Sequence, residues 1–212
     1  MEKFSIGIPT INRADLLIPS VERYINDFPN VDIHIIDNGK QGLKSLLSEY
    51  PNIFVHEQEK NLGVAASWNL LCNIIFSTKD YALILNDDVY LGYGSSVIRH
   101  CISEYGLCLV KSTTSFEVFL LNKHFYNVVG RFDEAFYPAY YEDSDYIYRM
   151  KLSDVYFYIE EMLNPKEQVI SGTYEKDPEL TNNAKATNRE IYIKKWGGMP
   201  LLETFTKPYE NG

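Results

Sequence analysis

The chain has few cysteines and few basic residues, and each shortage argues against a class of protein. Three cysteines occur in 212 residues, without the spacing of a zinc site, so we expect reduced thiols in an intracellular protein. Lysine and arginine number 20 against 29 aspartates and glutamates, and the formal net charge is −9. Because binding a phosphate backbone requires basic clusters, nucleic acid is not expected as a partner.

Long hydrophobic runs are also absent. No apolar stretch reaches the length of a transmembrane segment, and the N-terminus lacks the charged-then-apolar order of a signal peptide. We therefore expect a cytoplasmic protein, either free or peripheral to a membrane. The four histidines show no zinc spacing. The length suits one domain, residues 1–212.

Apolar strands and amphipathic helices alternate over the first part of the chain. We expect strands at 4–10, 31–37, 53–56 and 81–86, and helices at 14–28, 43–50 and 64–78. Pro19 suggests that the first regular helix begins only near that residue. This alternation predicts an α/β fold with a mostly parallel sheet flanked by helices.

The second half alternates less regularly. We expect strands at 107–110, 116–121 and 155–160, and helices at 124–129, 142–152 and 188–196. Residues 171–187 are polar and poor in large aliphatic side chains. This composition predicts a mobile loop or lid.

Two adjacent carboxylates follow the fourth predicted strand. The apolar run at 81–85 continues directly into Asn86, Asp87 and Asp88. Open α/β sheets bind their ligands at the carboxyl ends of buried parallel strands. Paired oxygen ligands there suit Mg²⁺ or Mn²⁺, which are usually shared with substrate phosphates. The alternative is an ordinary turn, because Asn and Asp are common turn formers.

Polar residues also follow the first two predicted strands. Thr10, Asn12 and Arg13 end the first strand, and Asp37 and Asn38 end the second. Because parallel strands end at the same edge of a sheet, these groups are expected to meet the acidic pair in one crevice. For Asp37 and Asn38 alone, a plain turn is an equal alternative.

The segment from Asn61 to Asn69 opens the helix before the fourth strand. Gly63 permits close approach of another backbone, and the N–H groups of a helix N-terminus suit a nucleotide. The alternative is that Asn61 simply caps the helix. With a single glycine, the segment is not a glycine-rich phosphate loop.

Three acidic residues open the helix predicted at 142–152. Glu142, Asp143 and Asp145 follow an aromatic stretch, where a carboxylate can have a raised pKa that suits a general base. The alternative is structural, since acidic residues in a first turn complement the helix dipole. Asp145 can also pair with Arg149 four residues later.

In order and spacing, these segments resemble the family 2 glycosyltransferases of the GT-A fold, over about residues 4–198. The matching segments are Ile6–Arg13, Ile35–Gly39, Asn61–Gly63 with Asn69, Leu85–Val89, Gly130–Glu134 with Tyr141–Asp145, and Lys195–Gly198. The resemblance implies a single GT-A domain with a Rossmann-like, mostly parallel sheet. Residues 1–90 would bind the nucleotide-sugar, and residues 91–200 would form the acceptor-binding subregion.

The resemblance also implies an activity. A hexosyltransferase of this kind moves a sugar, with inversion, from a UDP- or dTDP-sugar donor to a hydroxyl of an acceptor, often a glycan, with Mn²⁺ or Mg²⁺. Asp37 matches the residue that reads the uracil or thymine ring, Asp88 the metal ligand, and Asp143 the catalytic base. The remaining matches are Pro9, Thr10, Asn12, Arg13, Asn38, Asn61, Gly63, Asn69, Asn86 and Asp87 on the nucleotide-sugar side, and Glu142, Asp145 and Trp196 on the acceptor side.

Two features depart from the family pattern. Asn86 replaces the first acid of the family's metal motif, so it offers an oxygen but no charge. No histidine follows His124, so the remaining protein ligand of the metal is unassigned or replaced by water.

Two other classes of protein remain open. A sugar nucleotidyltransferase can share such a sheet and metal, but its glycine- and basic-rich loop is missing after the first predicted strand. A non-catalytic module that binds nucleotide-sugars or glycans would use the carboxylates only as structure.

Overall fold

The computed structural model describes residues 2–89, 91, 94–105, 110–111, 116–155, 158–159 and 178–210. Cys108, most of the strand expected at 107–110, part of that expected at 155–160, and residues 171–177 of the expected lid lie outside these ranges. Cys72 and Cys101 are buried and form no disulfide within the described residues. In the described parts, none of the helices combines the length and apolarity needed to cross a membrane.

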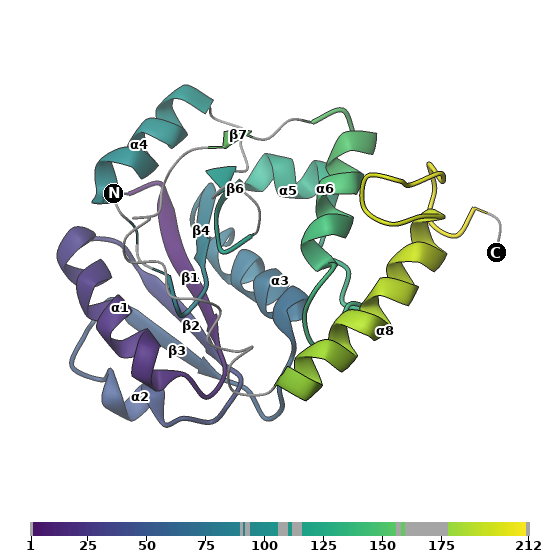
Figure 1. Ribbon diagram of the computed structural model, residues 1–212. Coiled ribbons are helices and arrows are strands. Elements are labelled where there is room, and N and C mark those ends of the chain that lie inside the picture. The colour runs from purple at the N-terminus through teal and green to yellow at the C-terminus, as the bar shows by residue number, and fades with distance from the viewer. Residues whose placement is uncertain are drawn as a thin grey trace.

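A mostly parallel sheet forms the middle of the molecule (Figure 1). Its described strands are β1 (Phe4–Thr10), β2 (Ile33–Asp37), β3 (Ile53–Glu57), β4 (Tyr81–Leu85), β5 (Val110–Lys111), β6 (Val118–Asn122) and β7 (Tyr158–Ile159). The order is β3-β2-β1-β4-β6-β5-β7. Strands β3, β2, β1 and β4 run parallel, and β6 is antiparallel to β4. The predicted α/β class is therefore confirmed.

Helices cover both faces of this sheet. They are α1 (Ala14–Asp27), α2 (Leu43–Leu46), α3 (Val64–Ile75), α4 (Gly94–Tyr105), α5 (Lys123–Val129), α6 (Glu142–Leu152) and α8 (Pro178–Trp196). Helices α1, α2 and α4 share one hydrophobic core with the sheet, and α3, α5 and α6 share the other. Helix α8 packs against α6 through a smaller aromatic cluster (Figure 1).

Strand β4 is buried on both faces, which explains its unbroken apolar sequence. Leu83 and Leu85 pack into the core beneath α1, whereas Ala82 and Ile84 pack into the core beneath α3. A strand in the middle of a parallel sheet is covered on both sides and therefore needs apolar residues at every position. Polar residues therefore occur only beyond the ends of such a strand, where the chain leaves the sheet.

The expected start of the first helix was wrong. Helix α1 begins at Ala14 and contains Pro19. Proline removes one backbone hydrogen bond from a helix. The buried stripe of Leu17, Val21 and Tyr24 nevertheless holds the helix on the sheet, and tertiary packing of an apolar face supplies most helical stability.

The C-terminal helix is longer than expected, and the lid prediction is wrong for residues 178–187. Helix α8 starts at Pro178, a residue that suits the first helical position. Its buried residues are spaced as on a helix, but the first of them are small or polar: Thr181, Ala184 and Asn188. Helix α4 was not predicted at all.

Two histidines on neighbouring strands are held mostly in the neutral form. Nδ1 of His34 lies 3.3 Å from Nε2 of His56. Burial, together with the nearby charge of His56, lowers the pKa of His34 from 6.5 to about 4, and burial also lowers the pKa of His56. As the pH falls, these histidines therefore become protonated at a higher pH in the unfolded chain than in the folded one.

We expect the free energy of unfolding to fall as the pH drops from 6.5 toward 4, and to be fully retained above 6.5. The loss should reach about 2 kcal/mol near pH 5. Urea unfolding of the parent and of His34→Gln at neutral and mildly acidic pH measures it. The variant should lose less stability on acidification, and an equal loss in both proteins would contradict this account.

Candidate functional site

The carboxyl ends of β1, β2 and β4 meet at one edge of the sheet. Thr10 at the end of β1 is paired in register with Asp37 at the end of β2. The Thr10 hydroxyl donates a hydrogen bond of 2.7 Å to Oδ2 of Asp87, just beyond β4. The structure therefore brings together the three strand ends that the sequence singled out.

The acidic pair after β4 lies beside a buried arginine. Burial and the neighbouring Asp88 raise the pKa of Asp87 to about 6, although the Thr10 hydrogen bond and Arg13 act in the opposite direction. The Arg13 guanidinium is hydrogen-bonded to Asp15 and interacts electrostatically with both members of the pair. A second cation near these carboxylates would further favour their charged form.

The acidic pair fits part of a divalent-metal site. Asp87 and Asp88 supply hard oxygen ligands. The negative charge of Asp88 disfavours the ionised form of the buried Asp87 carboxylate. Mg²⁺ and similar ions are commonly bound by one or two carboxylates, with substrate phosphates and water completing the shell. Within the described ranges, no group of three or more His, Cys, Asp or Glu side chains is placed to hold an ion.

The loop after β1 packs against the loop after β2. Pro9 remains inside β1, opposite Ile36, and Asn12 adopts a left-handed backbone with φ of 55°. A Cβ atom on Gly39 would lie 2.5 Å from Oδ1 of Asn12. The absence of a side chain at Gly39 lets the two loops touch.

Asp37 organises the loop that follows it. Its carboxylate is fully buried; Oδ1 accepts from the Gly39 amide at 2.9 Å and Oδ2 from the Gln41 amide at 2.8 Å. The Gln41 side chain also donates to Asp37 and accepts from the backbone of Ala14. Sequence reasoning missed Gln41. A role for Asp37 in reading the base stays a prediction, because its oxygens already serve this loop.

Asn38 and Asn61 shape the chain that enters α3. The Asn38 side chain donates to the Ser67 hydroxyl and accepts from the Leu62 amide, each at 3.0 Å. Oδ1 of Asn61 accepts from the amide of Gly63 at 2.9 Å, one residue before the helix. Asn61 therefore stabilises the turn before α3 and does not cap the helix itself.

The close approach expected at Gly63 is made by the protein's own chain. A Cβ atom there would lie 2.9 Å from the carbonyl oxygen of Pro138 and from a ring carbon of Tyr137. The same Pro138 carbonyl accepts a 2.7 Å hydrogen bond from the amide of Val64. One of the N–H groups at the start of α3 is thus already used to hold residues 137–138.

We expect Gly63→Ala to lower the free energy of unfolding by about 1–3 kcal/mol, because φ is +79° and the added methyl collides with Pro138. Gly42→Ala is a control for positive φ alone, since φ is +70° there but nothing lies within 4 Å of the added atom. Urea unfolding compares the two variants. If Gly63→Ala lowered the free energy of unfolding no more than Gly42→Ala does, the collision with Pro138 would be contradicted.

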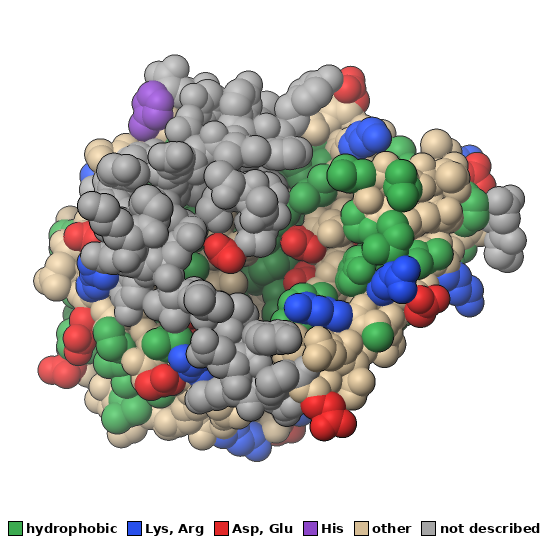
Figure 2. Space-filling model, viewed as in Figure 1, with side chains coloured by type: hydrophobic (Ala, Val, Ile, Leu, Met, Phe, Trp, Pro, Cys, Tyr) green, Lys and Arg blue, Asp and Glu red, His purple; other side chains and the backbone are tan. Residues whose placement is uncertain are grey.

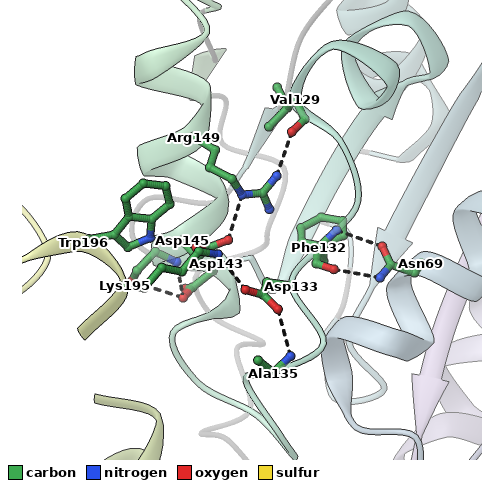
Figure 3. Close-up of polar contacts among 11 residues, drawn as sticks. Asn69, Val129, Phe132, Asp133, Ala135, Asp143, Asp145, Arg149, Lys195 and Trp196 are labelled. Atoms are coloured by element: carbon green, nitrogen blue, oxygen red, sulfur yellow. Dashed lines mark hydrogen bonds and ion pairs between the residues drawn. The ribbon is translucent and has the colours of Figure 1, made fainter. Parts of the chain in front are cut away.

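Asn69 is fully buried and uses its whole side-chain amide within the protein (Figure 3). The amide nitrogen donates to the Phe132 carbonyl at 2.9 Å and to Glu134 at 2.8 Å. Its oxygen accepts from the Phe132 amide at 2.9 Å and the Tyr126 hydroxyl at 3.0 Å. These four bonds exhaust the capacity of an amide side chain. Asn69 therefore positions the segment around residue 132, and its predicted contact with the nucleotide-sugar stays untested.

The start of α6 holds two carboxylates in different environments. Glu142 is buried, its Oε2 has no hydrogen-bond partner, and burial, reinforced by the charge of Asp143, raises its pKa to about 8. Oδ1 of the half-buried Asp143 accepts from the amide and hydroxyl of Ser144, at 2.7 and 3.3 Å. The raised pKa expected in this aromatic segment therefore falls on Glu142.

A buried ionic network joins α6 to α8 (Figure 3). Asp145 is fully buried and accepts from Arg149 at 2.8 Å, as the structural alternative predicted, and from the indole of Trp196 at 2.8 Å. Lys195 pairs with both Asp145 and Asp133. Sequence reasoning did not single out Lys195 or Asp133 individually, although both lie in segments that match the family.

Helix α8 also holds the aromatic segment that precedes Asp143. The side chain of Asn188 is fully buried and donates to the carbonyls of Ala139 and Tyr140, at 2.7 and 3.1 Å. Tyr140 and Tyr141 both have positive φ, 79° and 73°. The sequence carried no clear signal for Asn188, because a polar residue at the start of an expected helix looks like a solvent-exposed one.

A pocket opens next to Asp143. It is lined by Tyr140, Tyr141, Ser144 and Lys185, and Ser144 is the residue whose amide and hydroxyl contact the Asp143 carboxylate. On the face of the molecule in Figure 2, acidic side chains gather at a hollow, and a basic side chain lies beside them. The arrangement can bind a small polar molecule within reach of a carboxylate.

Comparison with known proteins agrees with this architecture. Residues 5–95 match the model of Glycosyl transferase family 2. The solved structure of GalNAc-T7 with UDP, GalNAc and Mn²⁺ is similar to this chain, with a sequence identity of 13%. Its TM-score is 0.63, over 92% of this chain and 48% of that chain. A protein of Desulfovibrio desulfuricans G20, provisionally assigned as a nucleotide-diphospho-sugar transferase, is 11% identical, with a TM-score of 0.56 over 91% of this chain and 96% of that one. No curated protein sequence matches the chain.

The fold is that of the GT-A glycosyltransferases. The match at residues 5–95 is to the family that the sequence resembles, Glycosyl transferase family 2, and covers less than half of the chain. The chain spans only about half of the GalNAc-T7 structure, 48% of its length.

Proposed function

We propose that this protein transfers a hexose, with inversion, from a UDP- or dTDP-sugar to a hydroxyl of a glycan acceptor, with Mn²⁺ or Mg²⁺ bound at Asp88. The observation that carries the proposal is the meeting of Thr10, Arg13 and the acidic pair at the carboxyl edge of the sheet. The family 2 match covers these residues. GalNAc-T7, a structure of the same fold, holds UDP, GalNAc and Mn²⁺, which supports the donor and the metal.

The donor would bind along the loops at this edge. Asp88, with Asp87 and the side-chain oxygen of Asn86, would hold the metal ion together with the diphosphate. When bound, the ion would neutralise the charge that develops on the departing diphosphate. The Thr10 hydrogen bond orients the Asp87 carboxylate, and Arg13 adds a fixed positive charge nearby.

Asp143 would act as the general base. It takes the proton of the acceptor hydroxyl while that oxygen forms a bond to the anomeric carbon. The bond from this carbon to the diphosphate breaks, and its electron pair leaves with the diphosphate. Attack from the opposite face inverts the anomeric configuration. Ser144 orients the Asp143 carboxylate through two hydrogen bonds.

The alternatives predict different chemistry. A sugar nucleotidyltransferase would consume a nucleoside triphosphate and a sugar phosphate and release pyrophosphate. A non-catalytic module would bind the nucleotide-sugar and leave it intact. The family 2 match favours sugar transfer over both.

A thermal-shift screen of nucleotide-sugars, with and without Mn²⁺, tests the proposal. We expect UDP- or dTDP-sugars to raise the melting temperature only when the metal is present, since a ligand that binds the folded state stabilises it. Asp88→Asn should fold normally and lose this shift. Indifference of the parent protein to every nucleotide-sugar would contradict the proposed function.

A further inference from the structure

Two strained residues lie immediately before the start of α6. Tyr140 and Tyr141 have φ angles of 79° and 73°, and a non-glycine residue stays in this left-handed region only when the surrounding structure enforces it. Strain of this kind gathers at active sites. Asp143, the proposed base, follows two residues after Tyr141, in the first turn of the helix. Whatever holds the turn at Tyr140 and Tyr141 therefore also fixes the position of Asp143.

The usual local cap is missing at the start of α6. An N-cap residue is commonly Ser, Thr, Asp or Asn, with an extended backbone and a side chain that binds the first turn. Tyr141 occupies this position with a left-handed backbone, and its side chain makes no capping hydrogen bond. Contacts from other parts of the chain must therefore help to set the direction in which α6 begins.

Asn188 of α8 supplies such a contact. Its side chain is fully buried, and its amide nitrogen donates to the carbonyl oxygens of Ala139 and Tyr140, at 2.7 and 3.1 Å. Because a carbonyl oxygen can only accept, the NH₂ group must face the turn. Among the described residues, the amide oxygen of Asn188 has no hydrogen-bond partner. The hydrogen bonds that this side chain makes are thus the two that it donates to the turn.

The same segment is also held from its other side. The carbonyl of Pro138 accepts a 2.7 Å hydrogen bond from the amide of Val64, at the start of α3. The Glu142 carboxyl accepts a hydrogen bond from the backbone of Tyr140. Three consecutive carbonyl groups, from Pro138 to Tyr140, are therefore bound by two helices. A backbone fixed in this way places the groups that follow it before any substrate binds.

Asn188 belongs to a buried face of α8 that is itself anchored. Tyr192 and Trp196 follow it at intervals of four residues, the spacing of one helix face, and all three side chains are buried. The Tyr192 ring packs on Tyr141, and the Trp196 indole donates to Asp145. Helix α8 accordingly lies alongside the segment that leads into α6 (Figure 1). Asn188 thus acts from a fixed helix and not from a loop.

From these contacts we propose that Asn188 is a positioning residue for sugar transfer: by holding the carbonyls of Ala139 and Tyr140, it keeps Asp143 where it can take the proton of the acceptor hydroxyl. The inference rests on the proposed function, because Asp143 is the base of that reaction. Asn188 is fully buried, so it acts through the backbone of the turn. A displacement of about 1 Å in a reacting group can lower a rate about 100-fold.

Kinetic measurements on Asn188→Ala and Asn188→Asp test the inference. The first variant removes the donor, and the second replaces it by an oxygen of the same shape that faces two carbonyl oxygens. We expect both variants to lower kcat by about 10- to 100-fold, measured as release of UDP or dTDP from the nucleotide-sugar. Affinity for UDP or dTDP with Mn²⁺, measured by isothermal titration, should change little, because the acidic pair after β4 lies on another element.

Tyr192→Phe is the matched control. Tyr192 is equally buried on the same face of α8, and its hydroxyl donates to Glu203, in the segment after the helix. The variant keeps the ring and loses one buried hydrogen bond, so kcat should be retained. Urea unfolding checks that every variant is folded. An equal loss of kcat in Tyr192→Phe and in the Asn188 variants, or parental kcat in both Asn188 variants, would overturn the inference.

A glycine at position 140 separates positioning from a general loss of packing. Glycine adopts a positive φ without strain, so the turn depends less on Asn188 when Tyr140 is replaced. We expect Asn188→Ala to lower kcat less in the Tyr140→Gly background than in the parent. Equal fold-losses in the two backgrounds would show that Asn188 does not act through this turn, and the inference would be wrong.

The same measurements distinguish the inference from the proposed function. If the parent binds UDP or dTDP with Mn²⁺ and releases the nucleoside diphosphate during turnover, while both Asn188 variants match it, only the role of Asn188 is refuted. If the parent neither binds these nucleotides nor turns over a nucleotide-sugar, the proposed function is refuted, and the role of Asn188 in sugar transfer with it.

Discussion

Replacing Asp143 by Asn is expected to lower kcat by about 100- to 10,000-fold, the usual contribution of a general base. The amide keeps an oxygen that can accept the two hydrogen bonds from Ser144, so the loop should stay in place. What is lost is the ability to take a proton from the acceptor hydroxyl. Donor binding and the free energy of unfolding should change little. Release of the nucleoside diphosphate during turnover measures the effect.

Glu142→Gln is the matched control for this experiment. Its carboxyl group is adjacent and similar in size, but burial raises its pKa to about 8, so the group is mostly neutral at neutral pH. Exchanging a neutral acid for a neutral amide should lower kcat far less than Asp143→Asn does. If Asp143→Asn turns over at the parent rate while Glu142→Gln is inactive, the base is Glu142 and the assignment of Asp143 is wrong.

Asp145→Ala is expected to cost about 3–5 kcal/mol of unfolding free energy. The carboxylate is fully buried and binds Arg149, Lys195 and Trp196. Its removal leaves the Arg149 and Lys195 charges less compensated in a region of low polarity and leaves the indole N–H without its acceptor. Breaking one member of such a network costs more than the network itself contributes.

Asp133→Ala is the control for the network. Asp133 also pairs with Lys195, but its side chain is 29% exposed, and Lys195 would keep its contact with Asp145. We expect a loss of about 1 kcal/mol, measured by urea unfolding alongside Asp145→Ala. Similar losses in the two variants would show that Asp145 is not the centre of the network.

The first half of the fold was predictable because local patterns decide it. A buried parallel strand requires an apolar run, and the run at 81–85 is followed by polar residues where the chain leaves the sheet. Helix α6 was placed correctly at 142–152, because acidic residues mark its start. The C-terminal helix was cut short because Thr181 and Ala184 are buried without being large and apolar.

The roles of individual polar residues were harder to predict. Asp37 and Asn69 belong to types that serve equally in loops and in ligand sites, and the structure shows their side chains engaged by the protein itself. The residue type alone therefore does not show whether Asp37 or Asn69 stabilises a loop or binds a ligand. The pairing of Lys195 with Asp133 and Asp145 joins positions 62 and 50 residues apart. Periodicity along the sequence carries no information on such contacts.

The central claim is that the acidic pair after β4 binds a nucleoside diphosphate through a divalent ion. Isothermal titration with UDP and with dTDP, in the presence and absence of Mn²⁺, tests it most directly when the parent protein is compared with Asp88→Ala. We predict that one of the two nucleotides binds the parent tightly only with Mn²⁺, and that the folded variant loses this metal-dependent affinity. Nucleotide binding that is unaffected both by Mn²⁺ and by the loss of Asp88, or its complete absence in the parent, would contradict the claim.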